Sequence, residues 1–243
     1  MKRIASISGG KDSTAMLILL YEQGITPDHI VFMNTGLEFP QTVRFVRGKL
    51  DKWCKEHFGV GVTFVYPERP FGYYFKKYGV PYAPKGRWCY RVLKRDPFYR
   101  WIRSSVKDIS VTLYVGYAYD ERDRFERARR EAEKWWEHKG KNVIVVAPLI
   151  EMKITEKEAE AICNKHGLLN PIYKYFRRTG CWLCPFQPKL EWFKLYKYYP
   201  ELWKTAKILE KKSLEMGKRS FRPDKTLEEL EREFKVIRTL DEV

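Results

Sequence analysis

The segment Ser8–Ser13, which reads SGGKDS, constrains the fold more than any other part of the chain. It follows an apolar run at residues 4–7 that fits a buried strand. It precedes an apolar run at residues 14–21 that is long enough for a buried helix. A strand that turns through two glycines into a helix leaves backbone N–H groups free at the helix N-terminus, where they and the helix dipole favour an anion. The segment therefore predicts a phosphate-binding loop.

The residue types within this loop suit a nucleotide phosphate. Gly9 and Gly10 have no Cβ, so the backbone can turn sharply and approach a phosphate closely. Lys11 adds a positive charge, and the hydroxyl groups of Ser8 and Ser13 add hydrogen-bond donors. The segment is not a Walker A loop, which has a longer spacing and a Lys followed by Ser or Thr. An ordinary strand-to-helix turn is the alternative interpretation, and we favour nucleotide binding.

Strands and helices alternate along the first 150 residues. The predicted strands are runs at residues 4–7, 29–33, 60–66, 111–116 and 143–146, and helical segments lie between them. This alternation predicts an α/β fold in which a parallel twisted sheet is flanked by helices. Ligands of such sheets bind beyond the carboxyl ends of the strands. We therefore expect a nucleotide-binding α/β domain over residues 1–150.

The remainder of the chain, residues 151–243, is expected to hold a cysteine-containing loop and a helical C-terminal region. Thr155 and Glu158 fit a capping box, which predicts a helix over residues 156–165. Helical patterns return beyond Gln187. In the first half, the segment 67–85 is rich in Pro, Gly and Tyr, and we interpret it as a loop on the substrate side with a short helix near residues 73–78.

The chain is strongly basic. Its 47 Lys and Arg residues exceed its 31 Asp and Glu residues, which gives a formal net charge of +16 at pH 7. Such an excess implies a polyanionic partner such as nucleic acid, or an anionic substrate such as a nucleotide. A generally charged surface, as in heat-stable proteins, is the alternative. No apolar run reaches the length of a membrane span and residues 1–7 are too short for a signal peptide, so we expect a soluble, cytoplasmic protein with no membrane partner.

The cysteines point to metal binding or thiol chemistry, because an odd number, five, argues against a secreted disulfide scaffold. Cys181 and Cys184 form a CxxC motif, and Cys89 lies in a basic, aromatic segment. These three thiols suit a [4Fe–4S] cluster with one open iron, or a zinc ion completed by a further ligand. The sequence does not choose between the two metals. Cys54 and Cys163 are expected to be small buried hydrophobic residues.

Several segments follow one another in an order that resembles a known family. They are SGGKDS, residues 34–40 (NTGLEFP), residues 89–94 (CYRVLK), residues 171–173 (PIY) and residues 180–184 (GCWLC). Over most of residues 1–187 they resemble the phosphoadenosine phosphosulfate (PAPS) reductase family of the N-type ATP pyrophosphatases. The resemblance implies an adenine nucleotide alpha hydrolase-like fold, whose PP-loop, here SGGKDS, splits ATP between the α and β phosphates.

Two features depart from the pattern of this family. Sulfonucleotide reductases are expected to carry a catalytic cysteine in a C-terminal tail, whereas the last cysteine of this chain is Cys184. The family's Gly-x-Arg after the fourth strand is Gly116-Tyr117-Ala118 here, so alanine replaces the arginine. A reductase without its nucleophile is hard to defend. The departures therefore move the prediction from reduction to activation and transfer.

The resemblance and the departures together suggest an ATP-dependent adenylating enzyme, a sulfurtransferase that acts on tRNA or DNA. ATP and Mg²⁺ would activate an oxygen or a carboxylate with release of pyrophosphate, and sulfur bound to the open iron of the cysteine-held cluster would be delivered afterwards. Lys11 would offset charge at the α-phosphate, and Asp12 would cap the turn or position Mg²⁺. We expect a sulfur-donor or electron-donor protein as a further partner, and a homodimer is left open.

The expected site residues fall into four sets. The nucleotide-binding set is Ser8, Gly9, Gly10, Lys11, Asp12, Ser13, Thr35 and Gly36, and the catalytic set is Lys11 and Asp12. The metal set is Cys89, Cys181 and Cys184, and the substrate-binding set, whose charges would contact phosphates, is Arg91, Lys94, Arg122, Arg124 and Arg127. Two alternatives stay open: a PAPS or APS reductase-like enzyme, and a non-catalytic nucleotide- or nucleic-acid-binding protein with a structural zinc.

Overall fold

The computed structural model describes residues 1–82, 87–107 and 110–241, and it divides the chain into two compact units. The first, which we call the sheet unit, comprises Met1–Asn34, Pro40–Val65 and Phe98–Tyr173. The second, which we call the helical unit, comprises Thr35–Phe39, Tyr66–Pro97 and Lys174–Val243. This division differs from the boundary near residue 150 that the sequence suggests, because both units are assembled from several separate segments.

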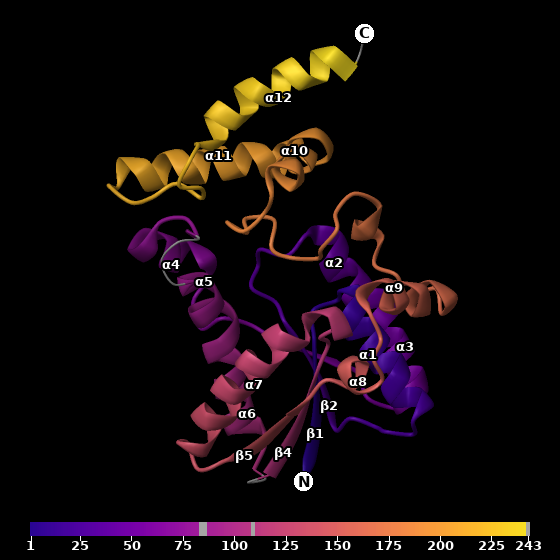
Figure 1. Cartoon of the computed structure of the whole chain (residues 1–243). Helices are drawn as coiled ribbons and strands as arrows, with labels where there is room; N and C mark the ends of the chain where they lie inside the picture. Colours follow the sequence, from indigo (N-terminus) through magenta and orange to yellow (C-terminus); the bar gives the residue numbers. More distant parts are fainter. Residues whose placement is uncertain (83–86, 108–109, 242–243) are drawn as a thin grey trace. The chain divides into compact units, whose positions relative to one another are not determined.

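The sheet unit contains five parallel strands in the order β3-β2-β1-β4-β5, which confirms the predicted parallel sheet flanked by helices (Figure 1). The strands are β1 Lys2–Ile7, β2 His29–Met33, β3 Val62–Val65, β4 Ser110–Val115 and β5 Asn142–Val146. In the centre, Ala5 of β1 pairs with Ile30 of β2 on one side and with Tyr114 of β4 on the other. The chain therefore runs outward from β1 in both directions, and this strand lies at the switch point where sheets of this kind bind ligands.

Helices cover both faces of this sheet, because successive side chains of each buried strand point to opposite faces. Ala5 packs in one apolar cluster and Ile4 in the other. The helices of the first face are α1 Lys11–Glu22, α2 Pro40–Phe45, the π-helical turn η1 Val46–Leu50, α3 Asp51–Phe58 and α9 Glu156–Lys165. Those of the second face are α6 Asp96–Ser105 and α7 Arg122–Glu137 (Figure 1). Short turns complete the unit: η3 Tyr119–Glu121, α8 Pro148–Glu151 and η4 Pro171–Lys174.

Helix α1 is the most deeply buried of these helices. Its residues Ala15–Ile18 and Leu20 are fully buried, and Cys54 of α3 and Cys163 of α9 are fully buried in the same apolar cluster. The expectation that these two cysteines are core residues is therefore confirmed. The burial of α1 fixes the position of its N-terminus, which carries the SGGKDS segment.

The helical unit has its own aromatic core. Its elements are α4 Phe71–Tyr78, α5 Trp88–Tyr90, the π-helical turn η2 Arg91–Arg95, α10 Lys189–Tyr198, α11 Pro200–Glu215 and α12 Leu227–Asp241. The ring of Trp192 lies 5.4 Å from Phe221 and 6.3 Å from Trp203, and Trp203 lies 5.8 Å from Phe234. The helical C-terminal region is thus confirmed. The expected short helix in the segment 67–85 is α4, which begins at Phe71, while residues 83–85 of that segment lie outside the described part of the chain.

In the described part of the chain, no helix combines the length and the apolar character that crossing a membrane requires.

Candidate functional site

The SGGKDS segment forms a tight loop between β1 and α1. Gly9 has a φ of +71°, a left-handed conformation that glycine adopts without strain. A Cβ at this position would lie 2.7 Å from Cγ2 of Val46, so the surrounding space also requires glycine. Helix α1 begins at Lys11 with Gly10 as its N-cap residue. The loop therefore presents the N-terminus of a long, buried helix at the carboxyl edge of the sheet, as the sequence predicts.

The two serines of the loop hold it in this shape. The Oγ of Ser13 accepts the Ser8 N–H at 3.1 Å and donates to the carbonyl oxygen of Gly10 at 3.1 Å. The Gly10 N–H donates to the Oγ of Ser8 at 3.2 Å. These bonds close the loop on itself, so its curvature is formed before any ligand binds.

Lys11 is the buried cation of this site, with a side chain that is 6% exposed. Its Nζ lies 2.8 Å from Oε2 of Glu156 and 3.6 Å from Oδ1 of Asp12. Its backbone N–H donates to the hydroxyl oxygen of Tyr173 at 2.9 Å. Burial lowers the pKa of Lys11, but the hydrogen bond to Glu156 and the charge of Asp12 raise it by more, so the pKa lies above its usual value. Lys11 is therefore protonated at neutral pH.

Asp12 is the buried carboxylate of this site. Burial raises its pKa to about 6, against a usual value of about 3.9, although the charge of Lys11 acts in the opposite direction. The Oδ1 atom is buried and makes no hydrogen bond within the described residues. Its ion pair with Nζ of Lys11, at 3.6 Å, is longer than a hydrogen bond, so this oxygen can still accept a donor or bind a cation.

Glu156 is placed beside Lys11 by the start of α9. The Thr155–Glu158 capping box that the sequence predicts is present, with both of its reciprocal hydrogen bonds. Glu156 is the first helical residue, and its N–H donates to Oδ1 of Asp120 at 3.1 Å. The cap fixes where the helix begins, and the sheet order then brings this residue to Lys11. The sequence predicts the helix start but not this ion pair.

Asn170 and Gly116 support the loop from behind, and neither contact with the loop is predicted from the sequence. The side-chain amide of Asn170 donates to the carbonyl oxygen of Gly9 at 2.8 Å and to Oγ1 of Thr42 at 3.3 Å. A Cβ on Gly116 would lie 2.5 Å from both the Cα and the backbone N of Ser13. The available signals were weak: Asn170 precedes the PIY segment, and Gly116 is the last residue of the fourth predicted strand and the first of the altered Gly-x-Arg segment.

A second polar cluster lies within the helical unit and is built around Glu38. This carboxylate accepts the N–H of Thr35 at 2.8 Å and its Oγ1 hydroxyl at 2.8 Å, and Nζ of Lys94 lies 3.4 Å away. The Sγ of Cys181 lies 3.7 Å from both Oγ1 of Thr35 and Oε1 of Glu38. The Trp182 N–H donates to the carbonyl oxygen of Leu37 at 3.0 Å, and this bond joins the backbone segment of Thr35–Phe39 to that of the CxxC motif. Thr35 therefore belongs to this cluster and Gly36 to the same segment of the helical unit, whereas Ser8–Ser13 belong to the sheet unit.

Burial controls the thiols near this cluster. It raises the pKa of Cys181 to about 12, although Lys94 acts to lower it, and it raises the pKa of Cys89 as well. Both residues are therefore neutral thiols at pH 7. The pKa of Lys94 is raised by Cys181 and by Glu38. Because a neutral thiol carries no charge, Glu38 is the residue that pairs with the Lys94 ammonium group at pH 7.

The predicted metal centre is not assembled from these residues. Within residues 1–82, 87–107 and 110–241, no group of three or more His, Cys, Asp or Glu side chains is arranged to hold a metal ion. The Cys184 N–H donates to the carbonyl oxygen of Cys181 at 3.0 Å within the CxxC turn. As arranged, Cys89, Cys181 and Cys184 do not fit a three-ligand centre, and the iron–sulfur cluster and the zinc ion stay predictions.

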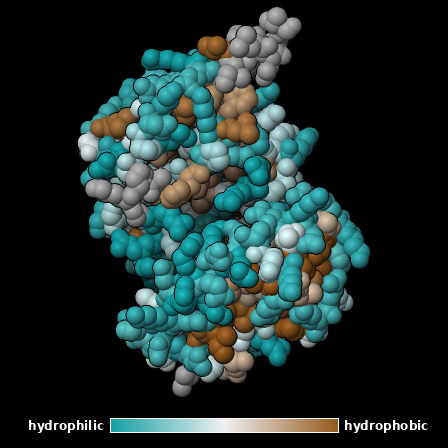
Figure 2. Space-filling model, in the orientation of Figure 1, coloured by the Kyte–Doolittle hydropathy of each residue, from teal (hydrophilic) through white to brown (hydrophobic). Residues whose placement is uncertain are grey.

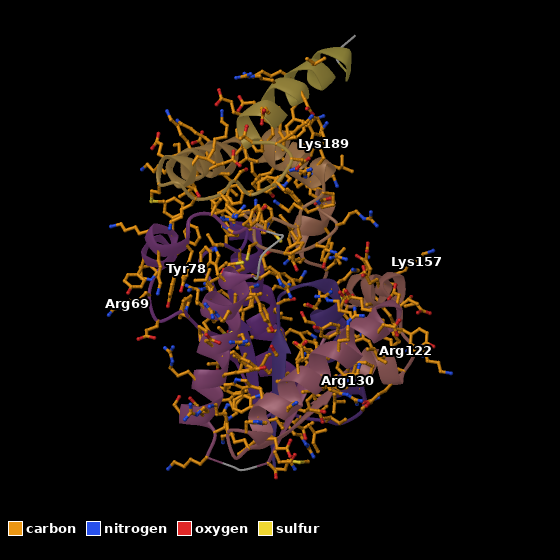
Figure 3. The ribbon with its side chains drawn as sticks, turned by 60° about the vertical axis from the view of Figure 1, so that its left-hand side comes forward. Arg69, Tyr78, Arg122, Arg130, Lys157 and Lys189 are labelled. Atoms are coloured by element: carbon orange, nitrogen blue, oxygen red, sulfur yellow. The ribbon has the colours of Figure 1, made fainter. Side chains whose placement is uncertain are left out.

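The predicted substrate-binding residues are divided between the two units. Arg91 is exposed on η2, and Lys94 is paired with Glu38; both belong to the helical unit. Arg122, Arg124 and Arg127 are exposed on the first turns of α7 in the sheet unit, and Figure 3 shows Arg122 and Arg130 along this helix. Arg124 forms an ion pair with Glu121.

Comparison with known proteins identifies relatives without an assigned activity. The chain is 29% identical over 201 residues to the uncharacterized protein MJ0973 of Methanocaldococcus jannaschii, a match that covers 82% of this chain and 45% of that protein. It is 30% identical over 149 residues to the uncharacterized nin region protein ORF290 of Escherichia phage lambda, with 52% of this chain and 51% of that protein covered. The chain thus spans about half the length of these curated relatives.

A solved structure and a family model identify the fold and the family. The crystal structure of phosphoadenylyl-sulfate (PAPS) reductase from Candida auris, a phosphate complex, matches with a TM-score of 0.50 at 13% identity, covering 75% of this chain and 82% of that one. This likeness supports the fold alone. The family model described as the phosphoadenosine phosphosulfate reductase domain matches residues 2–187, so the chain belongs to this PAPS reductase-like family of the PP-loop superfamily.

Proposed function

We propose that the chain binds ATP at the SGGKDS loop and transfers its adenylyl group to an acceptor oxygen with release of pyrophosphate. The observation that carries this proposal is the environment of Lys11. A protonated lysine, 6% exposed, begins α1 at the carboxyl edge of the sheet, directly after a loop closed by Ser8 and Ser13. A fixed cation and a helix N-terminus at one point suit the charge of a polyphosphate.

The residues of the loop would each take one task. Without a ligand, the Gly10 N–H donates to the Oγ of Ser8 and the Lys11 N–H donates to the hydroxyl oxygen of Tyr173. When ATP binds, both N–H groups would donate to phosphate oxygens. Lys11 would leave Glu156 and pair with the phosphates. The acceptor oxygen would attack the α-phosphorus, the bond from the α-phosphorus to the bridging oxygen would break, and pyrophosphate would carry that oxygen away. Lys11 would stabilise the charge that develops in this step.

Mg²⁺ fits the same site. Its coordination commonly uses one or two carboxylates together with phosphate oxygens and waters. Asp12 offers a buried Oδ1 that makes no hydrogen bond within the described residues. Bound there, Mg²⁺ would neutralise phosphate charge during the transfer.

A nucleic acid, tRNA or DNA, is the proposed acceptor. After adenylation, sulfide supplied by a separate sulfur-donor protein would attack the activated atom of the acceptor, and the bond from that atom to the adenylylated oxygen would break with release of AMP. The net charge of +16 supports a polyanionic acceptor. A sulfonucleotide reductase-like activity is the alternative function.

Product analysis with ATP radiolabelled at the α-phosphate tests the proposal. Incubation with Mg²⁺ and a tRNA or DNA pool should form pyrophosphate together with labelled AMP or adenylylated acceptor, whereas simple ATP hydrolysis would form ADP. Lys11→Ala should abolish this product, and Lys52→Ala, at a 75% exposed lysine of α3, should leave it unchanged. Formation of ADP alone, or full activity of the Lys11 variant, would refute the proposal.

A further inference from the structure

We propose that one surface of the helical unit binds single-stranded nucleic acid by stacking bases on exposed aromatic rings and pairing phosphates with arginines. The surface, which we call the tyrosine–arginine surface, comprises Arg69, Tyr73, Tyr78, Arg87, Tyr90 and Phe186. The inference rests on the proposed function in one respect, because it names where the nucleic-acid acceptor is held.

The charge of the chain is concentrated in the helical unit. This unit has 25 Lys and Arg against 14 Asp and Glu, a net charge of +11 out of the +16 of the whole chain. Within its segment Tyr66–Pro97, eight Lys and Arg face only two acidic residues. A positive segment of this kind complements a phosphate backbone and does not distinguish one sequence from another.

Three aromatic rings of the surface are exposed to solvent. Tyr73 is 57% exposed, Tyr90 is 45% exposed and Phe186 is 56% exposed. On the face shown in Figure 2, hydrophobic residues form separate patches among hydrophilic ones. Rings that are mixed with charged groups suit a polar ligand with flat apolar parts, and an unpaired base is such a ligand.

A guanidinium group lies over one face of each of these rings. The Cζ of Arg69 lies 5.8 Å from the ring centroid of Tyr73, and the Cζ of Arg87 lies 5.0 Å from that of Tyr90 and 5.7 Å from that of Phe186. A base would stack on the opposite face of such a ring, and the arginine beneath the ring would attract the phosphates of the same strand. This pairing of rings with cations is the arrangement by which proteins hold single strands without reading their sequence.

Trp88 joins the helices that carry the surface. Its ring is stacked against Phe71, with centroids 6.1 Å apart and an interplanar angle of 19°, and against Tyr78, at 5.2 Å and 26°. These contacts hold α4 and α5 together. Figure 3 labels Arg69, which precedes α4, and Tyr78, the last residue of α4, with the Arg69 side chain reaching away from the ribbon.

Phe186 is brought to the surface by the CxxC turn. The Gln187 N–H donates to the carbonyl oxygen of Cys184 at 3.1 Å, and its side-chain amide donates to that of Trp182 at 3.1 Å. Phe186 is thus held between fixed neighbours and remains exposed. The turn that follows the CxxC motif, which is predicted to bind a metal, therefore carries one ring of this surface.

The geometry favours a single strand over a duplex. Base faces are hidden by neighbouring bases in a duplex, so exposed rings find no partner there, whereas unpaired bases can be splayed onto them. An acidic protein segment could satisfy the arginines but not the rings. Both alternatives are distinguished by experiment.

Fluorescence anisotropy with a labelled 15-nucleotide RNA of mixed, non-self-complementary sequence tests the surface. Tyr73→Ala and Tyr90→Ala should each weaken binding by about 5- to 150-fold, the range expected when one stacked base is released. Tyr73→Phe and Tyr90→Phe should restore binding, because they keep the ring. Tyr198→Ala, at a 43% exposed ring of α10 outside the surface, should bind as the unchanged chain does. Arg87→Ala should reduce the slope of log K against log salt by about 0.7 for each phosphate that is no longer neutralised.

Three outcomes would overturn the inference. They are unchanged affinity of both Tyr→Ala variants, equal affinity for a 15-base-pair duplex, and equal competition by poly-L-glutamate. The assay contains no ATP, so it is independent of the proposed function. Ring-dependent RNA binding by a chain that forms no adenylylated product would refute adenylation and leave the surface intact. RNA-dependent product formation that is unchanged in the Tyr→Ala variants would refute the surface and leave adenylation intact.

Discussion

Lys11 and Glu156 are 145 positions apart in the sequence, and their Nζ and Oε2 atoms lie 2.8 Å apart at the start of two packed helices. Glu156 thus holds the lysine of the phosphate loop in an ion pair before any ligand is bound. A phosphate that pairs with Lys11 must compete with this carboxylate. The pair therefore sets both the position of Lys11 and the affinity of the loop for anions.

Glu156→Gln should tighten ATP binding severalfold, because the amide keeps the size of the side chain and removes the competing charge. Equilibrium binding of ATP, measured by calorimetry, checks this. Glu131→Gln, at an exposed position of α7, provides the matched control for a change of one charge unit. Weaker ATP binding by Glu156→Gln would mean that the carboxylate is needed to orient Lys11 toward the ligand.

Gly116→Ala should destabilise the fold by about 1–3 kcal/mol and impair ATP binding. The added Cβ would lie 2.5 Å from backbone atoms of Ser13, which cannot move without displacing the first turn of α1. Gly48→Ala provides the control, because its Cβ meets nothing within 4 Å, and it should stabilise the chain by about 0.5–1 kcal/mol. Urea unfolding measures both changes. Equal stability of the two variants would show that the loop has room that the structure does not show.

Asp12→Asn should stabilise the protein at pH 8 and have little effect at pH 4. The folded-state pKa of Asp12, about 6, lies above its usual value of about 3.9, so the folded state disfavours the carboxylate. The resulting penalty is absent below about pH 4 and complete above about pH 6, and a shift of this size corresponds to about 3 kcal/mol at most. Denaturant unfolding at the two pH values measures it.

Asp28→Asn is the control of opposite sign. Burial acts to raise the pKa of Asp28, but the hydrogen bonds from the Lys2 side chain and the Arg3 N–H lower it below its usual value. The Asp28 carboxylate therefore stabilises the fold above its usual pKa, and the amide should cost stability at pH 8. If Asp12→Asn also lost stability at pH 8, the Asp12 carboxylate would stabilise the folded state by pairing with Lys11, and its burial would not be a net cost.

The sheet and part of the site were predictable from local sequence patterns. Apolar runs located all five strands, and the Thr155–Glu158 capping box located the start of α9. The SGGKDS loop follows from residue types that only a tight strand–helix turn requires. Contacts between residues far apart in the sequence were not predictable. The contact of Glu156 with Lys11 depends on the order of strands in the sheet, which no local pattern encodes.

The division of the chain into two units also depends on contacts between distant residues, which local sequence patterns do not encode. Thr35–Phe39 leaves the sheet unit for five residues and joins Cys181 and Lys94, so Thr35 is a neighbour of a thiol within the helical unit. Local composition cannot reveal a five-residue segment that belongs to a different unit from the residues on either side of it. The predicted role of Thr35 and Gly36 beside the nucleotide therefore remains a prediction.

Lys94→Met should destabilise the helical unit by about 1–3 kcal/mol. Glu38 is 3% exposed, and Lys94, which lies 3.4 Å from it, is 35% exposed. Removing one partner of a buried pair leaves an uncompensated charge and costs about 3–5 kcal/mol, and screening at the partly exposed Lys94 reduces this figure. The double variant Lys94→Met with Glu38→Gln should recover much of the loss, because no charge is then left unpaired. Lys212→Met, at an exposed position of α11, is the matched control. Urea unfolding of the unchanged chain, Lys94→Met, Glu38→Gln and the double variant gives the coupling energy of the pair. A value near zero would show that the two residues act independently.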